Sequence, residues 1–496
     1  MNVIKHLGAA SLLATLLAGC SLAPTYERPA LPVQTQWPAD LAATANANVN
    51  ANAGGSEAPS AASLPWQQFF RDPSLRQLIS LALDHNRDLR VAALNIERAR
   101  SLYQVQSADR LPTLNLGVSG ARQETPNAVA PAGKGGLTTA YSVGLGVTAF
   151  ELDLFGRVRN LSGAALERFS ATEQARKTTQ ISVVAQVAYT YEALVADERL
   201  LALARQTLDS RTASHQRQVS LREMGASSDY DLRQSDSLLE AARIALLQAQ
   251  RQRALDQNAL ALLIGQPVPA GLLPAADTDW NGSVIAELPA GLPSDLLTGR
   301  PDIAQQEALL RAANANIGAA RAAFFPRISL TGSFGSASDA LNGLFESGSR
   351  AWSFLPSITL PIFDGGRNRA NLGVAQADRD IAVAQYEKTI QVAFREVADA
   401  LAGQATLGAE LRAVQAQERA EQQRHDLAKL RYDSGEASYL DYLDAQRAWF
   451  ASQQQTIRTG LAEVQNRIAL YKSLGGGWQE QSSSSATATD RLARKD

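Results

Sequence analysis

The sequence Arg300-Pro-Asp-Ile303 opens the stretch that decides the fold of this chain. A helical pattern follows it and ends at Phe324-Phe-Pro326, where proline cannot continue a helix. Two segments of alternating apolar and polar residues come next, and the second ends at Pro361-Ile-Phe-Asp-Gly-Gly-Arg367. Alternation with a period of two is typical of β-strands. The stretch therefore predicts a helix followed by two strands.

The same arrangement occurs earlier in the chain. Matched positions are 214 residues apart before the strands and 210 apart after them: Asp88 and Asp302, Pro112 and Pro326, Gly156-Arg157 and Gly366-Arg367, Val187 and Val397, Gly225 and Gly435, and Gly265 and Gly475. Single matches arise by chance, but one register held over about 110 residues indicates an internal duplication. We therefore predict a first repeat at 72–270, a linker at 271–299 and a second repeat at 300–477. The first repeat opens with a helical pattern from Asp72 to Ala108, with Pro73 just inside its start.

Each repeat continues into a long segment without proline, from Arg157 to Glu223 and from Arg367 to Ser434. In the first, apolar residues recur as a coiled-coil seam at Val184, Val187, Tyr191, Leu194, Leu201 and Leu208. A helix of this length measures about 100 Å and cannot fold back into a compact globule. Gly225 and Gly435 end the two helices, and further helices return toward Leu263 and Leu474. Each repeat is predicted to be a long helical hairpin attached to a β-hairpin.

The predicted strands have one apolar face and one face of small, mostly hydroxyl-bearing residues, such as Ser329, Ser333 and Ser353. This pattern suits a transmembrane β-barrel with a water-filled lumen and lipid outside. The alternative is a half-buried sheet of a soluble protein, which four short strands alone would favour. The long helices favour the membrane interpretation. Because four strands cannot close a barrel, that interpretation requires an oligomer.

The N-terminus has the features of an export signal. Residues 1–19 combine a weakly positive start with an apolar run too short to span a bilayer. The sequence Leu17-Ala-Gly-Cys20 resembles a bacterial lipoprotein signal, in which cleavage leaves an acylated Cys20. The alternative is an ordinary signal peptide with an incidental cysteine. We expect residues 20–71 to be a lipidated segment with a flexible linker rich in alanine, asparagine and serine at 42–63, and residues 478–496 to be a disordered tail.

Composition argues against several functions. The net charge of −2 provides no basic surplus for nucleic acid. His85, His215 and His425 are far apart in the sequence, so we expect solvated helix positions and no metal site. The sequence contains no His-Glu-x-x-His, Gly-x-Ser-x-Gly or phosphate-binding loop motif. We therefore predict no enzyme activity and no cofactor, apart from the covalent lipid on Cys20.

The charges of most interest lie beside the helix turn at Gly435. Asp441 and Asp444 are three residues apart, on one face of a helix. In a threefold assembly, an inward-facing aspartate from each chain forms a ring that attracts cations and can narrow a pore. The alternative is a solvated acidic face in which Arg447 forms an ordinary ion pair.

Taken together, the motifs resemble those of TolC-type outer-membrane efflux channels, in the lipoprotein branch that includes OprM and the NodT-like factors. The residues that carry the resemblance are Cys20-Ser-Leu-Ala-Pro-Thr-Tyr-Glu-Arg-Pro29, Gly291-Leu-Pro-Ser-Asp-Leu-Leu297, Arg300-Pro-Asp-Ile303, Phe324-Phe-Pro326, Pro361-Ile-Phe-Asp-Gly-Gly-Arg367 and Leu443-Asp-Ala-Gln-Arg447. The resemblance implies a mainly α fold with a transmembrane β-barrel. Each chain of a homotrimer would give four strands to a twelve-stranded barrel that stands on a long α-helical coiled-coil barrel.

The resemblance also implies a function and a location. The trimer would lie in the cell outer membrane, lipid-anchored, and extend into the periplasm. It would be the passive exit duct of a tripartite efflux system, of the RND type, for drugs or other small toxic compounds. Its partners would be a periplasmic adaptor (membrane fusion) protein, an inner-membrane efflux pump and outer-membrane lipid. The alternatives are a periplasmic structural coiled-coil lipoprotein and an exit channel of the type I secretion kind.

Five residues match a periplasmic gate in that family. Asp441 and Asp444 match an acidic constriction, and Asp444 with Arg447 matches a gate pair. Tyr432 and Asp231 match a hydrogen-bonded link that holds the tip closed. Where the family pattern has a further arginine, this chain has alanine at position 437. The closing network of this chain is therefore expected to be thinner, or to rely on Arg447.

Overall fold

The structure is a computed structural model of the chain, and it describes residues 21–34, 64–126, 128, 135–278 and 299–479. The chain divides into two compact units. The sheet unit comprises 1–30, 95–173 and 305–386, and the helical unit comprises 31–94, 174–304 and 387–496. The signal peptide, Cys20 and the segment 42–63 lie outside the described residues, as do most of the linker 271–299 and residues 480–496.

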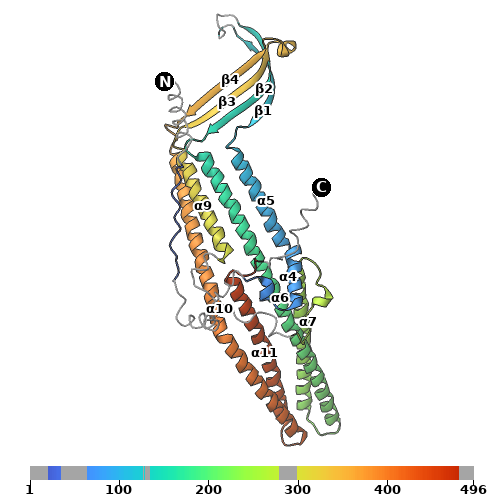
Figure 1. The fold of residues 1–496 in the computed structure, drawn as a ribbon. Helices are drawn as coiled ribbons and strands as arrows, with labels where there is room; N and C mark the ends of the chain where they lie inside the picture. Colours follow the sequence, from blue (N-terminus) through green and yellow to red (C-terminus); the bar gives the residue numbers. More distant parts are fainter. Residues whose placement is uncertain (1–20, 35–63, 127, 129–134, 279–298, 480–496) are drawn as a thin grey trace, which may run out of the picture. The chain divides into compact units, whose positions relative to one another are not determined.

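The helices follow the predicted repeat (Figure 1). They are α3 (Trp66–Phe69), α4 (Pro73–His85), α5 (Arg87–Ala108), α6 (Arg157–Glu223), α7 (Asp229–Ile264), η3 (Ala270–Leu272), α9 (Pro301–Ala322), η5 (Leu341–Phe345), α10 (Arg367–Asp433) and α11 (Tyr439–Ser473). Both α6 and α10 have 67 residues, as the proline-free segments predicted. Among the described residues, no helix combines the length and apolar character needed to cross a bilayer.

The sheet unit contains one antiparallel sheet in the order β1-β2-β3-β4 (Figure 1). Its strands are β1 (Leu114–Thr125), β2 (Gly136–Leu152), β3 (Arg327–Ser338) and β4 (Arg350–Thr359). The hairpin of each repeat therefore joins the other through β2 and β3. Among the described residues, β1 and β4 are the two edges, and each pairs on one side only.

The register keeps the two faces of the sheet chemically distinct. One cross-strand row consists of apolar residues, namely Leu116, Leu145, Phe334 and Trp352. A neighbouring row on the opposite face consists of Gly146, Ser333 and Ser353. Leu116 and Trp352 are 72% and 73% exposed in the single chain. An apolar face so open to its surroundings needs a non-aqueous environment or a partner.

The coiled-coil seam of α6 is confirmed within the helical unit. Five of its six predicted residues are at most 2% exposed: Val184, Val187, Tyr191, Leu194 and Leu201. Leu208, the last of the series, is only half-buried. The heptad pattern therefore marks the buried face of the helix up to the point where the helix approaches its distal turn.

The helical pattern from Asp72 to Ala108 is interrupted, contrary to the sequence expectation. Asp72 caps α4 by accepting N–H bonds from Ser74 and Leu75, with Pro73 in the first turn as expected. The helix then ends at Asn86, whose Oδ1 accepts the N–H groups of Asp88 and Leu89 and starts α5. Asparagine favours such a cap because its side chain competes with backbone partners.

Asn86 also shows that the duplication extends to individual contacts. Its Nδ2 donates to the carbonyl of Leu263 at 2.7 Å, and 214 residues later Arg300 Nη1 donates to the carbonyl of Ser473 at 2.9 Å. The helices that these carbonyls end are followed by left-handed glycines, with φ of 72° at Gly265 and 84° at Gly475. A Cβ on either glycine would lie 2.4 Å from the carbonyl oxygen of residue 85 or 299. The two halves therefore close their helices in the same way.

The predicted C-terminal tail begins too early. Trp478 lies against α6, with its ring 4.4 Å from Lys177 Nζ and its carbonyl accepting from Gln180 Nε2 at 3.4 Å. The packed part of the second repeat therefore includes residue 478. Three glycines precede this tryptophan in the sequence, and such a run is typical of a loop. The sequence pattern therefore did not predict the contact of Trp478 with α6.

Candidate functional site

Two matched helix turns lie at the distal end of the helical unit, between α6 and α7 and between α10 and α11. Gly225 and Gly435 adopt left-handed conformations, with φ of 75° and 80°. In each turn the residue after the glycine donates its N–H to a carbonyl five residues back, at 2.8 Å. This is the usual way in which a glycine ends a helix. The residues proposed for a gate are grouped around these turns.

Asp231 and Asp441 occupy equivalent places, 210 residues apart, at the starts of α7 and α11. The side chain of Asp231 accepts from Ser228 Oγ at 2.6 Å, and that of Asp441 accepts from Ser438 Oγ at 2.8 Å. Asp441 also accepts the Ser438 N–H, which completes a capping box. These hydrogen bonds from Ser438 lower the pKa of Asp441. Both aspartates therefore hold helix starts, a role that the repeated Ser-x-x-Asp sequence could have revealed.

Asp444 connects α10 to α11. Its carboxylate contacts the guanidinium of Arg424 on α10, and it accepts from Arg447 Nη2 at 3.3 Å. The structure therefore brings the predicted pair of Asp444 and Arg447 together and adds a partner that the sequence analysis missed. Arg424 is distant in sequence, so only the packing of two helices could place it here. The Asp444 side chain is 55% exposed, which leaves the cluster open to water and ions.

The predicted link between Tyr432 and Asp231 is not formed within one chain. Asp231 bonds instead to its local cap residue, Ser228. The ring of Tyr432 stacks on Tyr442, with centroids 5.7 Å apart and planes 7° apart, and its hydroxyl accepts from Gln218 Nε2 at 3.4 Å. The physical reason is the local helix cap, in which the hydroxyl of Ser228, three residues before Asp231, bonds to the Asp231 carboxylate. In the single chain Tyr432 therefore contacts α11 through its ring and α6 through its hydroxyl.

The expectation that His425 is solvated is wrong. This residue is 8% exposed, and its ring centroid lies 4.7 Å from that of Trp449 and 5.6 Å from that of Tyr442. Its Nδ1 lies 3.1 Å from Asp426 Oδ1. The aromatic residues of α11 cover His425. They could not be predicted as its partners from the sequence, because only the packing of α10 against α11 brings them together. Within the part of the chain that the structure describes, no three His, Cys, Asp or Glu side chains converge as a metal site.

Arg211 is a further residue that sequence reasoning missed. It belongs to α6 near the distal turn and is 5% exposed. Burial lowers the pKa of its guanidinium, which lies near Tyr439 and Tyr442 and near the like-charged Arg447. The neighbouring Ser210 accepts from Gln446 Nε2 at 2.9 Å. The interface between α6 and α11 is therefore polar and aromatic at this end.

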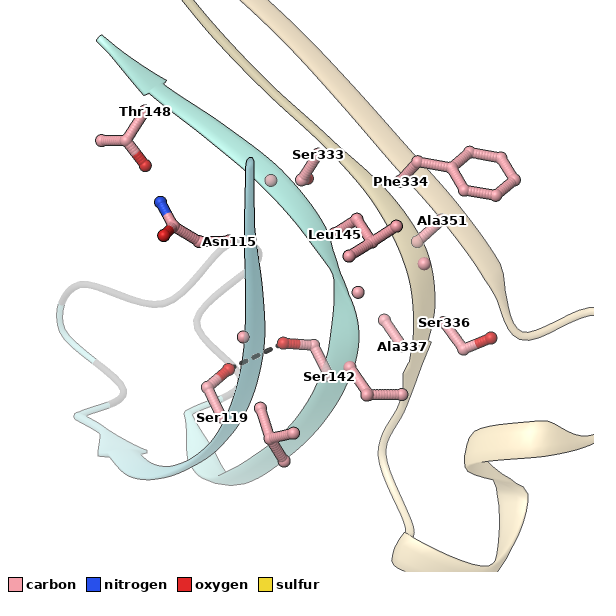
Figure 2. Close-up of a pocket in the computed structure, with 16 residues that line it drawn as sticks. Asn115, Ser119, Ser142, Leu145, Thr148, Ser333, Phe334, Ser336, Ala337 and Ala351 are labelled. Carbon is pink, nitrogen blue, oxygen red and sulfur yellow. Dashed lines mark hydrogen bonds between the residues drawn. The ribbon is translucent and has the colours of Figure 1, made fainter. Parts of the chain in front are cut away.

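The polar face of the sheet forms a second candidate site in the sheet unit. A cavity of about 300 Å³ lies on it and is lined mostly by glycine, serine and alanine from the four strands. Figure 2 shows Asn115 and Thr148 on this side, the hydroxyls of Ser119 and Ser142 joined at 2.7 Å, and Phe334 pointing away. Ser333 and Ser353 form a similar pair at 2.8 Å. Small uncharged groups can line a path without holding a solute strongly.

Comparison with known proteins identifies the class to which this fold and these sites belong. The model of the family described as outer membrane efflux protein matches residues 78–266 and 292–476, one range in each repeat. The chain therefore belongs to this family, of the TolC/OprM type. It is an outer-membrane channel component of efflux, and it lies in the outer membrane and extends into the periplasm.

Individual relatives match over nearly the whole chain. The solvent efflux pump outer membrane protein SrpC of Pseudomonas putida is 47% identical over 464 residues, which cover 93% of this chain and 96% of that protein. OprJ of Pseudomonas aeruginosa is 45% identical over 472 residues, 95% of this chain and 96% of OprJ. The open-state structure of the MtrE outer membrane channel of Neisseria gonorrhoeae aligns with a TM-score of 0.81 and 38% identity, over 93% of this chain and 99% of MtrE. The resemblance expected from the motifs is confirmed.

Proposed function

We propose that three copies of this chain form a passive exit duct, in which a twelve-stranded barrel continues into a helical tunnel. The observation that carries the proposal is the sheet, whose edges β1 and β4 have 12 and 10 residues and, within the described ranges, pair on one side only. Unpaired edges are untenable in hydrocarbon, so β1 of one copy must pair with β4 of the next. The exposed apolar face then meets lipid, and the hydroxyl-rich face lines the lumen.

The partners and cargo follow from the relatives. Those relatives are named as components of solvent, toluene and antibiotic efflux pumps. We propose that this duct serves a tripartite system with a periplasmic adaptor protein and an inner-membrane pump, and that it passes small, mostly apolar toxic compounds. Deleting the gene should lower the tolerated concentration of toluene, and unchanged tolerance to several such compounds would contradict this assignment.

The lipid anchor at Cys20 is part of the same proposal. The segment after it is held along α9 of the sheet unit: Arg321 Nη1 donates to the Leu22 carbonyl, and Asn314 Nδ2 donates to the Pro24 carbonyl. Further along the segment, Arg28 bonds to Glu307 of α9 at 2.9 Å. Burial raises the pKa of Glu307, but hydrogen bonds from Arg311 and Arg28 outweigh this effect and lower the pKa overall. Ser21, one residue from the anchor, is held as well, because its Oγ donates to Asn160 Oδ1 at 3.0 Å. Intact mass spectrometry should give the mass of a mature chain that begins at Cys20 and carries acyl chains. The mass of an unmodified chain would refute the anchor.

We further propose that the distal turns form the periplasmic gate, with Asp444 as its central charge. Replacing both Arg424 and Arg447 by alanine removes the contacts of Asp444 to α10 and within α11, and it leaves unbalanced carboxylates that repel across the threefold axis. We expect a several-fold rise in single-channel conductance in planar bilayers. Arg419→Ala removes an exposed arginine from the same helix and is the matched control.

The outcome for the aspartates separates gating from helix capping. Asp444→Asn should weaken cation selectivity and block by divalent cations, because it removes the ring charge without touching a cap. Asp441→Asn should also weaken the start of α11, because it disturbs the capping box. If the double arginine variant conducts like the native protein and the block survives in Asp444→Asn, the constriction lies elsewhere.

A further inference from the structure

A second cavity of the sheet unit, of about 520 Å³, lies where β2, β3 and β4 meet α6, α9 and α10. We call it the collar cavity. Its lining includes two aromatic rings and four charged side chains, namely Phe155, Phe325, Glu151, Arg157, Arg327 and Arg367. Its volume falls within the range of about 300–1,000 Å³ that is typical of small-molecule sites. Neither the proposed gate nor the hydroxyl-rich face of the sheet gives these rings and charges a role.

The collar cavity opens on the polar face of the sheet. Glu151 pairs in register with Ser329, and Arg327 pairs with Thr359. Arg327 and Ser329 are an even number of residues from Ser333 on β3, so their side chains lie on the same face of the sheet. This is the polar face, where the hydroxyl of Ser333 bonds to that of Ser353. A molecule moving along that face therefore meets the collar cavity at the end of the strands.

The charges of the collar cavity do not balance. Glu151 accepts from Arg157 Nε and Nη2 at 2.8 and 2.7 Å and pairs with Arg327 Nε at 2.7 Å. This carboxylate is 10% exposed and is occupied by both arginines. Arg367 is the third lining arginine, and in the described part of the chain its guanidinium forms no hydrogen bond or ion pair. Three cations and one anion give the lining a net charge of +2.

Two acids at nearby helix starts offset part of this charge, but in the described part of the chain neither forms a hydrogen bond or ion pair with the guanidinium of Arg367. Asp364 lies within electrostatic reach of Arg367, but its oxygens accept the backbone N–H groups of Gly366 and Asn368 at the start of α10. Asp153 likewise accepts the N–H of Arg159 at the start of α6. The two acids act as helix caps and Glu151 pairs with Arg157 and Arg327, which leaves the guanidinium of Arg367 available to a solute.

An apolar wall lies beside these cations. The rings of Phe155 and Phe325 are stacked, with centroids 4.8 Å apart and planes 23° apart. Phe325 is still 41% exposed, so part of its ring is open to a ligand. A ring pair next to guanidinium groups fits a solute that has a flat apolar body and an anionic head, because stacking and charge-assisted hydrogen bonds are then satisfied together.

We propose that the collar cavity is a binding station for amphiphilic anions, with the apolar body on Phe155 and Phe325 and the anionic group on Arg367. Its role in export rests on the proposed duct, whereas the binding itself does not. A station of this kind would hold an anionic solute briefly at the junction of strands and helices. Binding in a conduit has to be weak enough for release.

The test is isothermal titration of the purified full-length protein in dodecyl maltoside with naphthalene-2-sulfonate, with micelles alone as the blank. We expect one site per chain. Arg367→Gln should weaken sulfonate binding about tenfold, as the loss of one charge-assisted contact implies. Phe325→Leu should weaken it too. Arg379→Gln should leave it unchanged, because Arg379 on α10 is only partly exposed and is paired with Asp380. Naphthyl-trimethylammonium, which has the opposite charge, should bind at least tenfold more weakly than the sulfonate.

Three results would overturn the proposal: no sulfonate binding, equal binding of the ammonium compound, or native affinity in Arg367→Gln. Single-channel conductance of the same preparation separates this question from the duct. Open channels without sulfonate binding would remove the station and leave the duct. Sulfonate binding at Arg367 without any conductance would support the station and count against the duct.

Discussion

Replacing Arg300 by alanine is expected to destabilise the helical unit by about 3 kcal/mol, the lower end of the cost of removing one partner of a buried ion pair. Arg300 is 8% exposed, and its Nε and Nη2 bond to Asp302 at 3.0 and 2.6 Å. Its Nη1 bonds to Glu396 at 2.8 Å and to the Ser473 carbonyl at 2.9 Å. The variant leaves two carboxylates and a helix-ending carbonyl without their donor. The lower end applies because both carboxylates keep some contact with water.

Thermal unfolding followed by circular dichroism checks this result. The matched control is Asn86→Ala at the equivalent place in the first repeat, where one neutral hydrogen bond to Leu263 is lost together with the cap of α5. That variant should cost about 1–2 kcal/mol. If Arg300→Ala has the melting temperature of the native protein, the contacts of Arg300 do not stabilise the second repeat.

Placing a methyl group on Gly335 is expected to prevent assembly. A Cβ there would lie 2.1 Å from the carbonyl oxygen of Val143 and 2.5 Å from the Cα of Gly144. Both are backbone atoms of β2, so relief requires β2 and β3 to separate at the point where the two repeats join. We expect Gly335→Ala to reduce the heat-modifiable oligomer in outer-membrane fractions at least tenfold, on the order of the 1–3 kcal/mol or more that overpacking costs.

Gly117→Ala is the matched control for this change. Gly117 lies on the polar face of the same sheet, and a Cβ there would meet nothing within 4 Å. It should assemble like the native protein. Normal assembly of Gly335→Ala would show that the close approach of β2 and β3 is not needed for the fold.

The long elements of this fold could be read from the sequence because their signals are local and repeated. Proline-free segments gave both 67-residue helices, and left-handed glycines ended them at Gly225 and Gly435. The helix break at Asn86 was missed because apolar periodicity continues through it, while one side chain provides both the cap and a contact to Leu263. Apolar periodicity predicts which face of a helix is buried, but it does not predict where a capping side chain ends the helix.

The candidate gate was predictable only in part. The pair of Asp444 and Arg447 lies three residues apart on one helix, so spacing alone suggests it. Arg424 and the covering of His425 depend on how α10 packs against α11, which no local pattern encodes. The link between Tyr432 and Asp231 is not formed in the single chain, where Asp231 bonds to Ser228, and it stays a prediction for the assembled gate. The roles of Asp231 and Asp441 as matched caps were available from the duplication but were overlooked.

The central claim is that the single-chain sheet is one third of a closed barrel. Native mass spectrometry of the detergent-extracted protein, made on the same sample as single-channel recordings, tests it most directly. The account predicts a complex of three mature chains, each with its acyl mass, that forms conducting channels. A stable monomer or dimer, or a trimer that never conducts, would contradict it.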